Sequence, residues 1–342
     1  MMQHGFKTLI SLFVLAALAG CSSITPFSKK GKLQTIAFYN TGNLYDIQNN
    51  PTTTNDDDFL PTGAMQWDQA RYQAKLNALA AAIQHMGGKG GPAVIGLSEV
   101  ENRQVLEALL NMPALRKHDY EYILHESAKE PGLDVALLYK PNIFKLSSQR
   151  SIPVNVNERN FTARDILEVK GTLLGEPVTI FVNHWPSGRD SRKRAAANLL
   201  RNQIAALQQA DPTANIIVMG DFDEVPGSTI MRQALKATGR PNPAYNEELF
   251  NTFYIQHVQG NGSYFGRNGF MMLDQILVSK SLVDAAGHLQ YVRGSATIHS
   301  PASLKSLYGK YRNTPRPTYS GTTYFGGTSD HFPVYIKVQK VK

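Results

Sequence analysis

Short apolar runs recur along this chain from residue 33 onward, and they restrict its fold more than any other feature of the sequence. Most of the runs are apolar almost without interruption, which is typical of strands covered on both faces. Segments of helical period lie between some of them, so the pattern indicates an α/β domain. The predicted strands are Leu33–Tyr39, Ala93–Leu97, Val135–Tyr139, Ile166–Val169, Val178–Val182, Ile216–Met219, Ile276–Val278 and Phe332–Val338.

Two segments have the apolar stripe of an amphipathic helix. Asp68–Met86 carries such a stripe and is followed by two glycines that end the helix. Ser191–Gln209 is the second predicted helix. Two long loops remain, Thr41–Trp67 and roughly Ser300–Ser329, and loops of that length in a compact domain are usually functional or disordered.

Polar side chains that can bind a metal or transfer a proton stand at the ends of several predicted strands. If these strands share a sheet edge, their ends converge on one cleft, where α/β proteins usually bind ligands. A polar residue at the end of one strand is explained equally well as a capping or turn residue. Five such strand ends together favour a common site. The residues are Asn40, Glu99, His184, Asp221 with Asp223, and Asp330 with His331.

These side chains permit a narrow chemistry. The oxygen ligands Glu99, Asn40 and Asp330 suit a hard cation, Mg²⁺ first, with Mn²⁺ or Ca²⁺ as alternatives. A single cysteine and the absence of a paired-histidine motif argue against zinc. The chain has no phosphate loop and no nucleophile elbow. A carboxylate-bound cation with histidine for proton transfer is a standard arrangement for hydrolysing a phosphate ester.

Six motifs occur in order over residues 33–339. They are Ile36–Asn40 with Asn43–Asp46, Gly96–Asn102, Asn183–Ser187, Met219–Asp223, Leu273–Leu277 and Ser329–Val334. The ordered set resembles the endonuclease/exonuclease/phosphatase superfamily, in a bacterial lipoprotein branch. The resemblance implies a deoxyribonuclease I-like fold, an α/β four-layered sandwich of two packed mixed β-sheets flanked by helices. It also implies a metal-dependent phosphoester hydrolase.

The resemblance assigns the main roles residue by residue. Glu99 is expected to be the principal metal ligand, supported by Asn40 and Asp330. Asp221 is expected to orient or deprotonate the attacking water. His331 would contact the scissile phosphate and transfer a proton, held in orientation by Asp274.

Three further roles also come from the resemblance. His184 would assist the leaving oxygen, with Asp134 as its carboxylate partner. Arg164 would bind the substrate phosphate. Asp134 reads equally well as a turn residue at a strand edge, and Arg164 as a surface arginine.

The sequence departs from the family pattern at two positions. Asp223 replaces the usual asparagine, and an ionised carboxylate would repel a phosphate that an amide could bind. Asp223 must therefore ligate a metal, be protonated or point away. Glu101 replaces an arginine of the mammalian nuclease branch, which makes duplex DNA a less secure substrate. A further metal site at Asp56–Asp58 is conceivable, but we expect a solvated turn there.

The first thirty residues resemble an export signal followed by a tether. Residues 1–20 have the short apolar core of a signal peptide, too short to span a bilayer. Leu18–Cys21 resembles the lipoprotein cleavage box, which would make Cys21 the lipid attachment site and residues 21–32 a tether. An ordinary signal peptide beside a stray cysteine is the alternative. Ser22 favours the outer membrane, and we expect one domain over residues 33–342.

The net charge of +8 favours a polyanionic partner. In the last long loop, lysines and arginines alternate with tyrosines, which would suit a nucleic-acid strand or, equally, a tyrosine-rich loop packed on the domain. A second basic cluster, Arg189 and Arg192–Arg194, is expected to flank the cleft or to be a solvated helix face.

Three functions remain. The first is a cell-surface nuclease of low sequence specificity that acts on DNA or RNA as a monomer. The second is a phospholipid or sphingomyelin phosphodiesterase, or a phosphomonoesterase. A lipid-acting member would carry an exposed apolar hairpin, for which Phe265–Leu273 is the segment to inspect. The third, a non-catalytic surface binding protein, is disfavoured by the retained Glu99, Asp221, Asp274 and His331.

Overall fold

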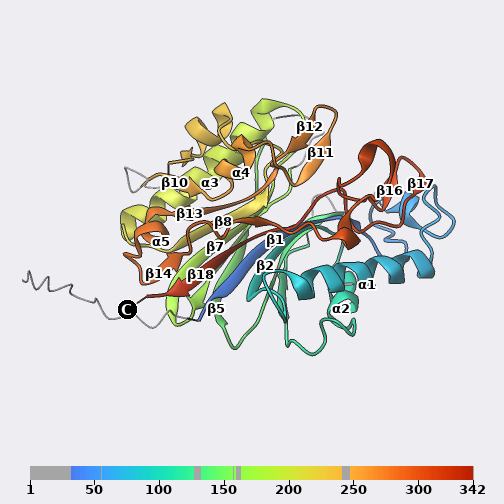
Figure 1. Cartoon of the computed structure of the whole chain (residues 1–342), viewed down its shortest axis with the longest axis horizontal. Helices are drawn as coiled ribbons and strands as arrows, with labels where there is room; N and C mark the ends of the chain where they lie inside the picture. Colours follow the sequence, from blue (N-terminus) through green and yellow to red (C-terminus); the bar gives the residue numbers. More distant parts are fainter. Residues whose placement is uncertain are drawn as a thin grey trace, which may run out of the picture. The chain divides into compact units, whose positions relative to one another are not determined.

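Two mixed β-sheets packed face to face form the centre of the protein in a computed structural model (Figure 1). The structure describes residues 32–341 except 55, 127–131, 157, 159–162 and 241–246. The expected signal peptide, the lipid-bearing Cys21 and nearly all of the tether lie outside these residues. None of the described helices is long and apolar enough to cross a membrane.

Each sheet has seven strands within the described residues. The first sheet has the order β14 (Leu289–Tyr291), β18 (Val334–Lys340), β1 (Gln34–Leu44), β2 (Val94–Val100), β4 (Asp134–Tyr139) and β3 (Glu121–Leu124), with β15 (Thr297–Ile298) beside β18. The second has the order β5 (Phe144–Ile152), β6 (Ile166–Leu173), β7 (Glu176–His184), β8 (Ile216–Asp221), β13 (Asp274–Ser279), β10 (Leu249–Asn251) and β9 (Ala237–Thr238).

Helices cover the outer face of each sheet (Figure 1). Helices α1 (Gln69–His85) and α2 (Arg103–Leu110) pack on the first sheet, and α3 (Asp190–Ala210) packs on the second. The remaining helical segments are α4 (Tyr254–Val258), α5 (Lys280–Asp284), η1 (Asp57–Phe59), η2 (Ile230–Ala234), η3 (Ala302–Leu304) and η4 (Gly309–Tyr311). Two hairpins complete the fold, β11 (Tyr264–Gly266) with β12 (Gly269–Met271) and β16 (Tyr319–Ser320) with β17 (Thr323–Tyr324). The predicted four-layered sandwich is confirmed.

The alternation of side chains along each strand produces the layers. In β1, Ile36 and Phe38 point into the core between the sheets, whereas Ala37 and Tyr39 point toward α1 and α2. The strands are therefore buried on both faces, as their continuous apolar runs predict. At Gly96 of β2 the sheets come so close that a Cβ atom would lie 2.7 Å from Met219 Sδ.

Both predicted helices are confirmed to within a residue at each end. The Asp68 side chain accepts a hydrogen bond from the amide of Arg71 and so caps α1. The two longest elements without a counterpart in the sequence prediction are the short helix α2, and β5, a strand at the edge of the second sheet whose central residues are exposed. An exposed edge strand lacks the apolar run by which strands were identified.

Candidate active site

Three polar side chains lie next to one another at the end of the second sheet. Asp221 of β8 is in register with His184 of β7 and with Asp274 of β13. Each lies two positions along its own strand from a residue of the inter-sheet core: His184 after Val182, Asp221 after Met219, and Asp274 before Ile276. Because alternate residues share a face, all three side chains point to the inner side of the sheet.

The first sheet contributes Asn40 and Glu99 through an irregularity in its strands. Asn40 continues the inward series of β1, but Glu99 stands where regular alternation would turn it toward the helices. The registers of β1 with β2 and of β2 with β4 shift at this point, and Glu99 has φ 61°. The hydroxyl of Thr41 donates to the carbonyls of Ser98 and Glu99, 2.8 and 2.9 Å away, and so fixes the bulge.

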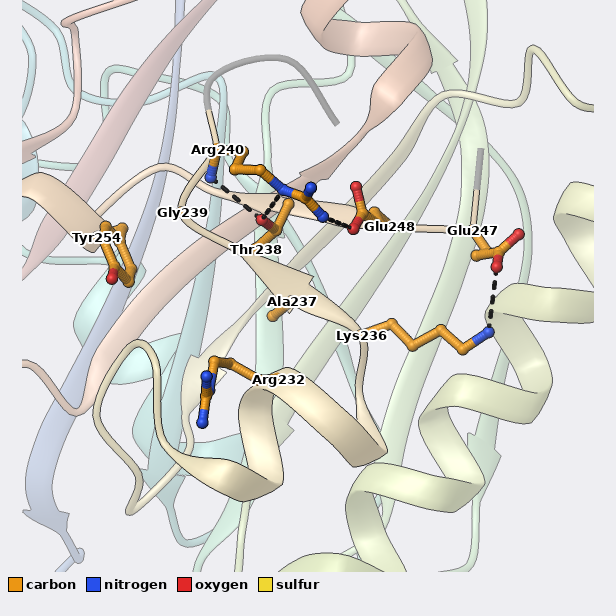
Figure 2. Close-up of a pocket in the computed structure, with 9 residues that line it drawn as sticks. All are labelled: Arg232, Lys236, Ala237, Thr238, Gly239, Arg240, Glu247, Glu248 and Tyr254. Atoms are coloured by element: carbon orange, nitrogen blue, oxygen red, sulfur yellow. Dashed lines mark hydrogen bonds and ion pairs between the residues drawn. The ribbon is translucent and has the colours of Figure 1, made fainter. Parts of the chain in front are cut away.

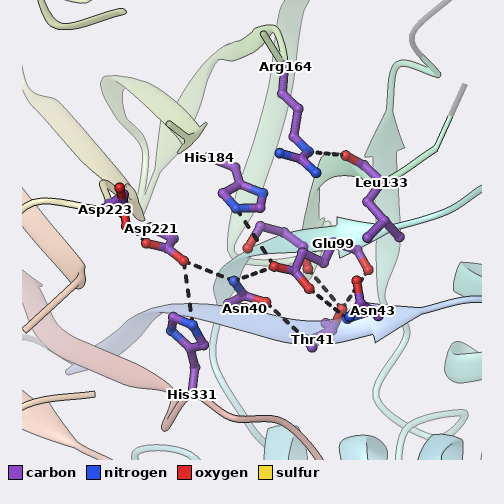
Figure 3. Close-up of polar contacts among 12 residues, drawn as sticks. Asn40, Thr41, Asn43, Glu99, Leu133, Arg164, His184, Asp221, Asp223 and His331 are labelled. Carbon is purple, nitrogen blue, oxygen red and sulfur yellow. Dashed lines mark hydrogen bonds and ion pairs between the residues drawn. The ribbon is translucent and has the colours of Figure 1, made fainter. Parts of the chain in front are cut away.

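The Asn40 amide connects the two sheets. Its Nδ2 donates to Glu99 Oε1 and to Asp221 Oδ2, both at 3.0 Å (Figure 3). The second oxygen of Glu99 accepts the backbone N–H of Asn43 at 2.7 Å. Carboxylates from opposite sheets are therefore held around one amide at the end of the core.

His331 completes this group from the segment before β18. Its Nδ1 lies 2.6 Å from Asp274 Oδ2, and its Nε2 lies 3.7 Å from Asp221 Oδ2. The Tyr264 ring packs against the imidazole with the ring centroids 4.9 Å apart. Burial on its own would lower the pKa of His331, but the neighbouring carboxylates of Asp274 and Asp221 raise it well above the usual value.

His184 has the opposite electrostatic setting. Burial, together with the positive charges of Arg164 and His331, lowers the pKa of His184 well below the usual value. Its Nε2 lies 3.8 Å from Glu99 Oε1. Its Nδ1 is buried and has no hydrogen-bond partner among the described residues, so its pairing with Asp134 stays a prediction.

Arg164 and Asp330 also lie close to the centre. The guanidinium of Arg164 extends toward His184 and donates from Nε to the carbonyl of Leu133 at 2.6 Å (Figure 3). Asp330 is exposed and directly precedes His331. Asp134, in contrast, is a buried residue in register with Val100, next to the bulge at Glu99.

Asp223 faces a cation that the sequence did not assign to it. Lys193 of α3 lies 3.5 Å from Asp223 Oδ2 and 2.6 Å from Glu224 Oε1. Burial raises the pKa of Asp223 above its usual value, and Lys193 partly opposes that effect. Of the remaining basic cluster, Arg189 and Arg192 pair with Glu158.

A buried lysine was not identified from the sequence. Lys75 of α1 is 2% exposed and donates to the carbonyls of Gly42 and Asn43 and to the Thr318 hydroxyl. Burial lowers its pKa to about 7, against the opposing effect of Glu99 and Asp330. Lys75 stands four residues before Leu79, on the buried face of α1, so helical period could have indicated its burial.

The acidic turn differs from expectation at one residue. Asp57 and Asp58 are exposed, as expected for a solvated turn. Asp56 is 2% exposed and accepts the backbone N–H of Asn50 at 2.7 Å. The prediction is therefore wrong for Asp56, whose carboxylate holds its own loop together instead of facing water.

The donor set around Asn40 fits a hard divalent cation. Glu99 and Asp221 place carboxylate oxygens at the same amide, and oxygen is the ligand type that Mg²⁺, Mn²⁺ and Ca²⁺ prefer. Asp221, Asp274 and His331 also place ligand atoms within 4.8 Å of one another. Because Nδ1 of His331 is already bonded to Asp274, this second group is better suited to proton transfer than to metal binding.

A separate cavity of about 560 Å³ contains none of the predicted site residues. It lies around Arg232 and Tyr254, and two ion pairs, Arg240 with Glu248 and Lys236 with Glu247, occupy much of its polar lining (Figure 2). Two of its three basic side chains are paired with its two acidic ones, so the site at the end of the core is the stronger candidate.

Comparisons with known proteins agree with this geometry. A family model described as the Endonuclease/Exonuclease/phosphatase family matches residues 35–340. TDP2 of D. rerio, solved with a single strand DNA product, is similar with a TM-score of 0.56 and 12% identity over 90% of this chain and 99% of that chain. A mannosyl-6-phosphatase of Bacteroides thetaiotaomicron VPI-5482 is similar with a TM-score of 0.54 and 18% identity over 90% of this chain and 100% of that chain. At these identities the solved structures show the shared fold alone. The search of curated proteins gives no significant match.

Proposed function

This chain belongs to the endonuclease/exonuclease/phosphatase family, and we propose that it is a divalent-metal-dependent phosphodiesterase that cleaves DNA or RNA with low sequence specificity. The observation that carries the proposal is the position of His331. Its Nδ1 is bonded to Asp274, and its Nε2 faces the Asp221 carboxylate, which shares the Asn40 amide with Glu99.

Glu99 would hold the cation, with Asn40 and Asp330 as the supporting oxygen ligands that the family resemblance indicates. When bound, Mg²⁺ would offset negative charge on the phosphoryl oxygens. Asp221 would orient a water molecule and accept its proton. Burial raises the pKa of Asp221, which makes it a stronger base than an ordinary aspartate.

The two histidines have different parts in this proposal. His331 carries a proton at Nε2 that can bond a phosphoryl oxygen, because Asp274 and Asp221 favour its charged form. His184 is neutral and, with Arg164 beside it, can contact the leaving oxygen or the phosphate. The low pKa of His184 keeps a second positive charge from forming next to His331.

Two observations support a polynucleotide substrate. The net charge of +8 attracts a chain of phosphates. The similar TDP2 was solved with single strand DNA. A phosphomonoesterase is the second candidate, because the similar Bacteroides enzyme is described as a mannosyl-6-phosphatase.

The test is a substrate panel on purified protein with Mg²⁺ and with a chelator. It contains plasmid, single-stranded DNA, RNA, sphingomyelin, phosphoinositides, mannose 6-phosphate and bis(4-nitrophenyl) phosphate. We expect metal-dependent cleavage of the polynucleotides and the small diester. Preference for a lipid head group or for the sugar phosphate would overturn the nuclease proposal.

We also propose that the protein is a monomeric outer-membrane lipoprotein of the bacterial cell envelope, anchored through Cys21 after removal of residues 1–20. Residues 21–32 would tether the catalytic domain of residues 33–342. Mass spectrometry of the membrane fraction should show an acylated N-terminal cysteine, and Cys21→Ser should release the protein from the membrane. A Cys21→Ser variant that stays in the membrane would contradict the anchor.

A further inference from the structure

The β11–β12 hairpin has two different faces. Tyr264 is paired with Met271, and Phe265 with Phe270, so adjacent residues project to opposite sides. Tyr264 packs on His331. Phe265 instead meets Phe270, with ring centroids 5.1 Å apart, and Tyr311, at 6.3 Å. The hairpin therefore separates His331 from a second aromatic surface.

A cavity of about 510 Å³ opens on this second surface. Phe270, which is 38% exposed, forms part of its wall. Gly262 and Phe332 are also lining residues. Gly262 precedes Ser263, whose hydroxyl accepts the Asp274 amide, and Phe332 follows His331. The cavity and the proposed active site are thus built from adjacent residues.

Three side-chain amides line the cavity. Asn261 Nδ2 donates to Gln256 Oε1 at 2.9 Å, which leaves the Gln256 NH₂ group and the Asn261 oxygen for a ligand. The amide of Asn313 makes no side-chain hydrogen bond within the described chain. Such amides pair with the donor and acceptor edges of nucleobases.

Cations without acidic partners surround the same surface. Lys305 lines the cavity, and Arg267 lies in the turn of the hairpin. Lys310 lies over the Tyr311 ring, 4.8 Å from its centroid, and Arg312 follows it. None of these four forms an ion pair among the described residues. Their charge is therefore available to a polyanion.

We propose that this cavity binds one nucleobase of a single-stranded polynucleotide, stacked on Phe270 and bonded by the amides of Gln256, Asn261 and Asn313. The neighbouring phosphates contact the surrounding cations while another phosphodiester of the strand lies in the active site. The inference rests on the proposed function and specifies its substrate as a single strand. An acyl chain would leave the three amides without partners, and a single sugar phosphate would not use four cations.

The test measures binding in a chelator, so that no cleavage occurs. Fluorescence anisotropy compares a labelled oligothymidylate with an abasic strand of equal length and charge. We expect the base-containing strand to bind about fivefold or more tightly, since one stacked base contributes roughly 1–3 kcal/mol. Phe270→Ala and Gln256→Ala should remove this preference and leave the affinity for the abasic strand unchanged. Phe325→Ala, at an exposed ring outside the cavity, should keep the preference.

Equal binding of the two strands by the unmodified chain would overturn the inference, and so would an unchanged preference in Phe270→Ala. Displacement of the strand by mannose 6-phosphate, or Phe270-dependent binding to anionic vesicles in place of the strand, would assign the cavity to another ligand and overturn it as well. Hydrolysis of bis(4-nitrophenyl) phosphate with Mg²⁺ needs no base site and reports on the proposed function alone. We expect that activity to persist in Phe270→Ala.

Discussion

Nδ1 of His331 lies 2.6 Å from Oδ2 of Asp274, and both side chains are buried. An ionised carboxylate only accepts hydrogen bonds, so the pair fixes the imidazole with a proton on Nδ1. We expect Asp274→Asn to lower the rate of phosphodiester hydrolysis by about 10²–10⁴-fold, because a neutral amide no longer favours the charged form of His331 that donates from Nε2. Initial rates with bis(4-nitrophenyl) phosphate measure the effect. A rate close to that of the unmodified chain would show that Asp274 does not orient His331.

The carboxylate of Glu99 should be required for metal binding. Mg²⁺ should raise the thermal midpoint of the unmodified chain, since a ligand that binds only the folded state stabilises it. In Glu99→Gln that shift should disappear together with activity. Glu247→Gln is the control, because its exposed ion pair with Lys236 lies away from the site and is worth little. A metal-induced shift that survives Glu99→Gln would place the cation elsewhere.

The pairing of Lys193 with Asp223 predicts an effect on substrate affinity. In Lys193→Met the Asp223 carboxylate keeps its negative charge beside the site without its partner. KM for an anionic diester should rise about three- to tenfold, since like charges at short range near a surface repel by on the order of 1 kcal/mol or more. Adding Asp223→Asn to this variant should restore KM, whereas a KM that stays high in the double variant would assign the effect to Glu224 or to the fold.

Lys75 should make stability depend on pH. Burial lowers its pKa to about 7, so above that pH the unfolded chain binds more protons at this position than the folded chain. The contribution of Lys75 to the free energy of unfolding therefore rises with pH and is constant below about pH 7. Relative to Lys75→Met, the unmodified chain should gain on the order of 2 kcal/mol between about pH 7 and pH 9.

Chemical denaturation at several pH values measures this gain. The matched control is Lys89→Met, at an exposed lysine just beyond the end of α1, which should show no such trend. A difference between the unmodified chain and Lys75→Met that does not vary with pH would mean that Lys75 stays charged in the folded state.

Side-chain alternation explains which site residues could be predicted. Val182, Met219 and Ile276 lie in the inter-sheet core, so a polar residue two positions away must lie at the end of that core. His184 and Asp221 follow this rule and come together as the strand-end pattern predicts, and Asp274, which only the family resemblance indicated, lies beside them in register with Asp221.

The remaining contacts depend on tertiary structure. Glu99 enters the site through a bulge. The bulge interrupts the alternation of side chains between the two faces of the sheet, which a prediction from the sequence assumes to be regular. The contact of Lys193 with Asp223 requires that α3 pack beside the end of β8. The two residues lie thirty positions apart in the sequence, and no local sequence pattern indicates their contact. The aromatic loop divides between the two expected alternatives: Tyr319 and Tyr324 pack on the domain, whereas Tyr308 and Tyr311 are exposed.

The order of the strands has a consequence for synthesis of the protein. The chain builds most of the first sheet, then the second, and finally returns to place β18 between β14 and β1. His331 directly precedes that last strand. A nascent chain that already carries Asn40, Glu99, His184, Asp221 and Asp274 therefore lacks the histidine that is proposed to transfer a proton, and the first sheet is still divided where β18 belongs. The proposed active site and the first sheet are therefore completed by the same segment of the chain.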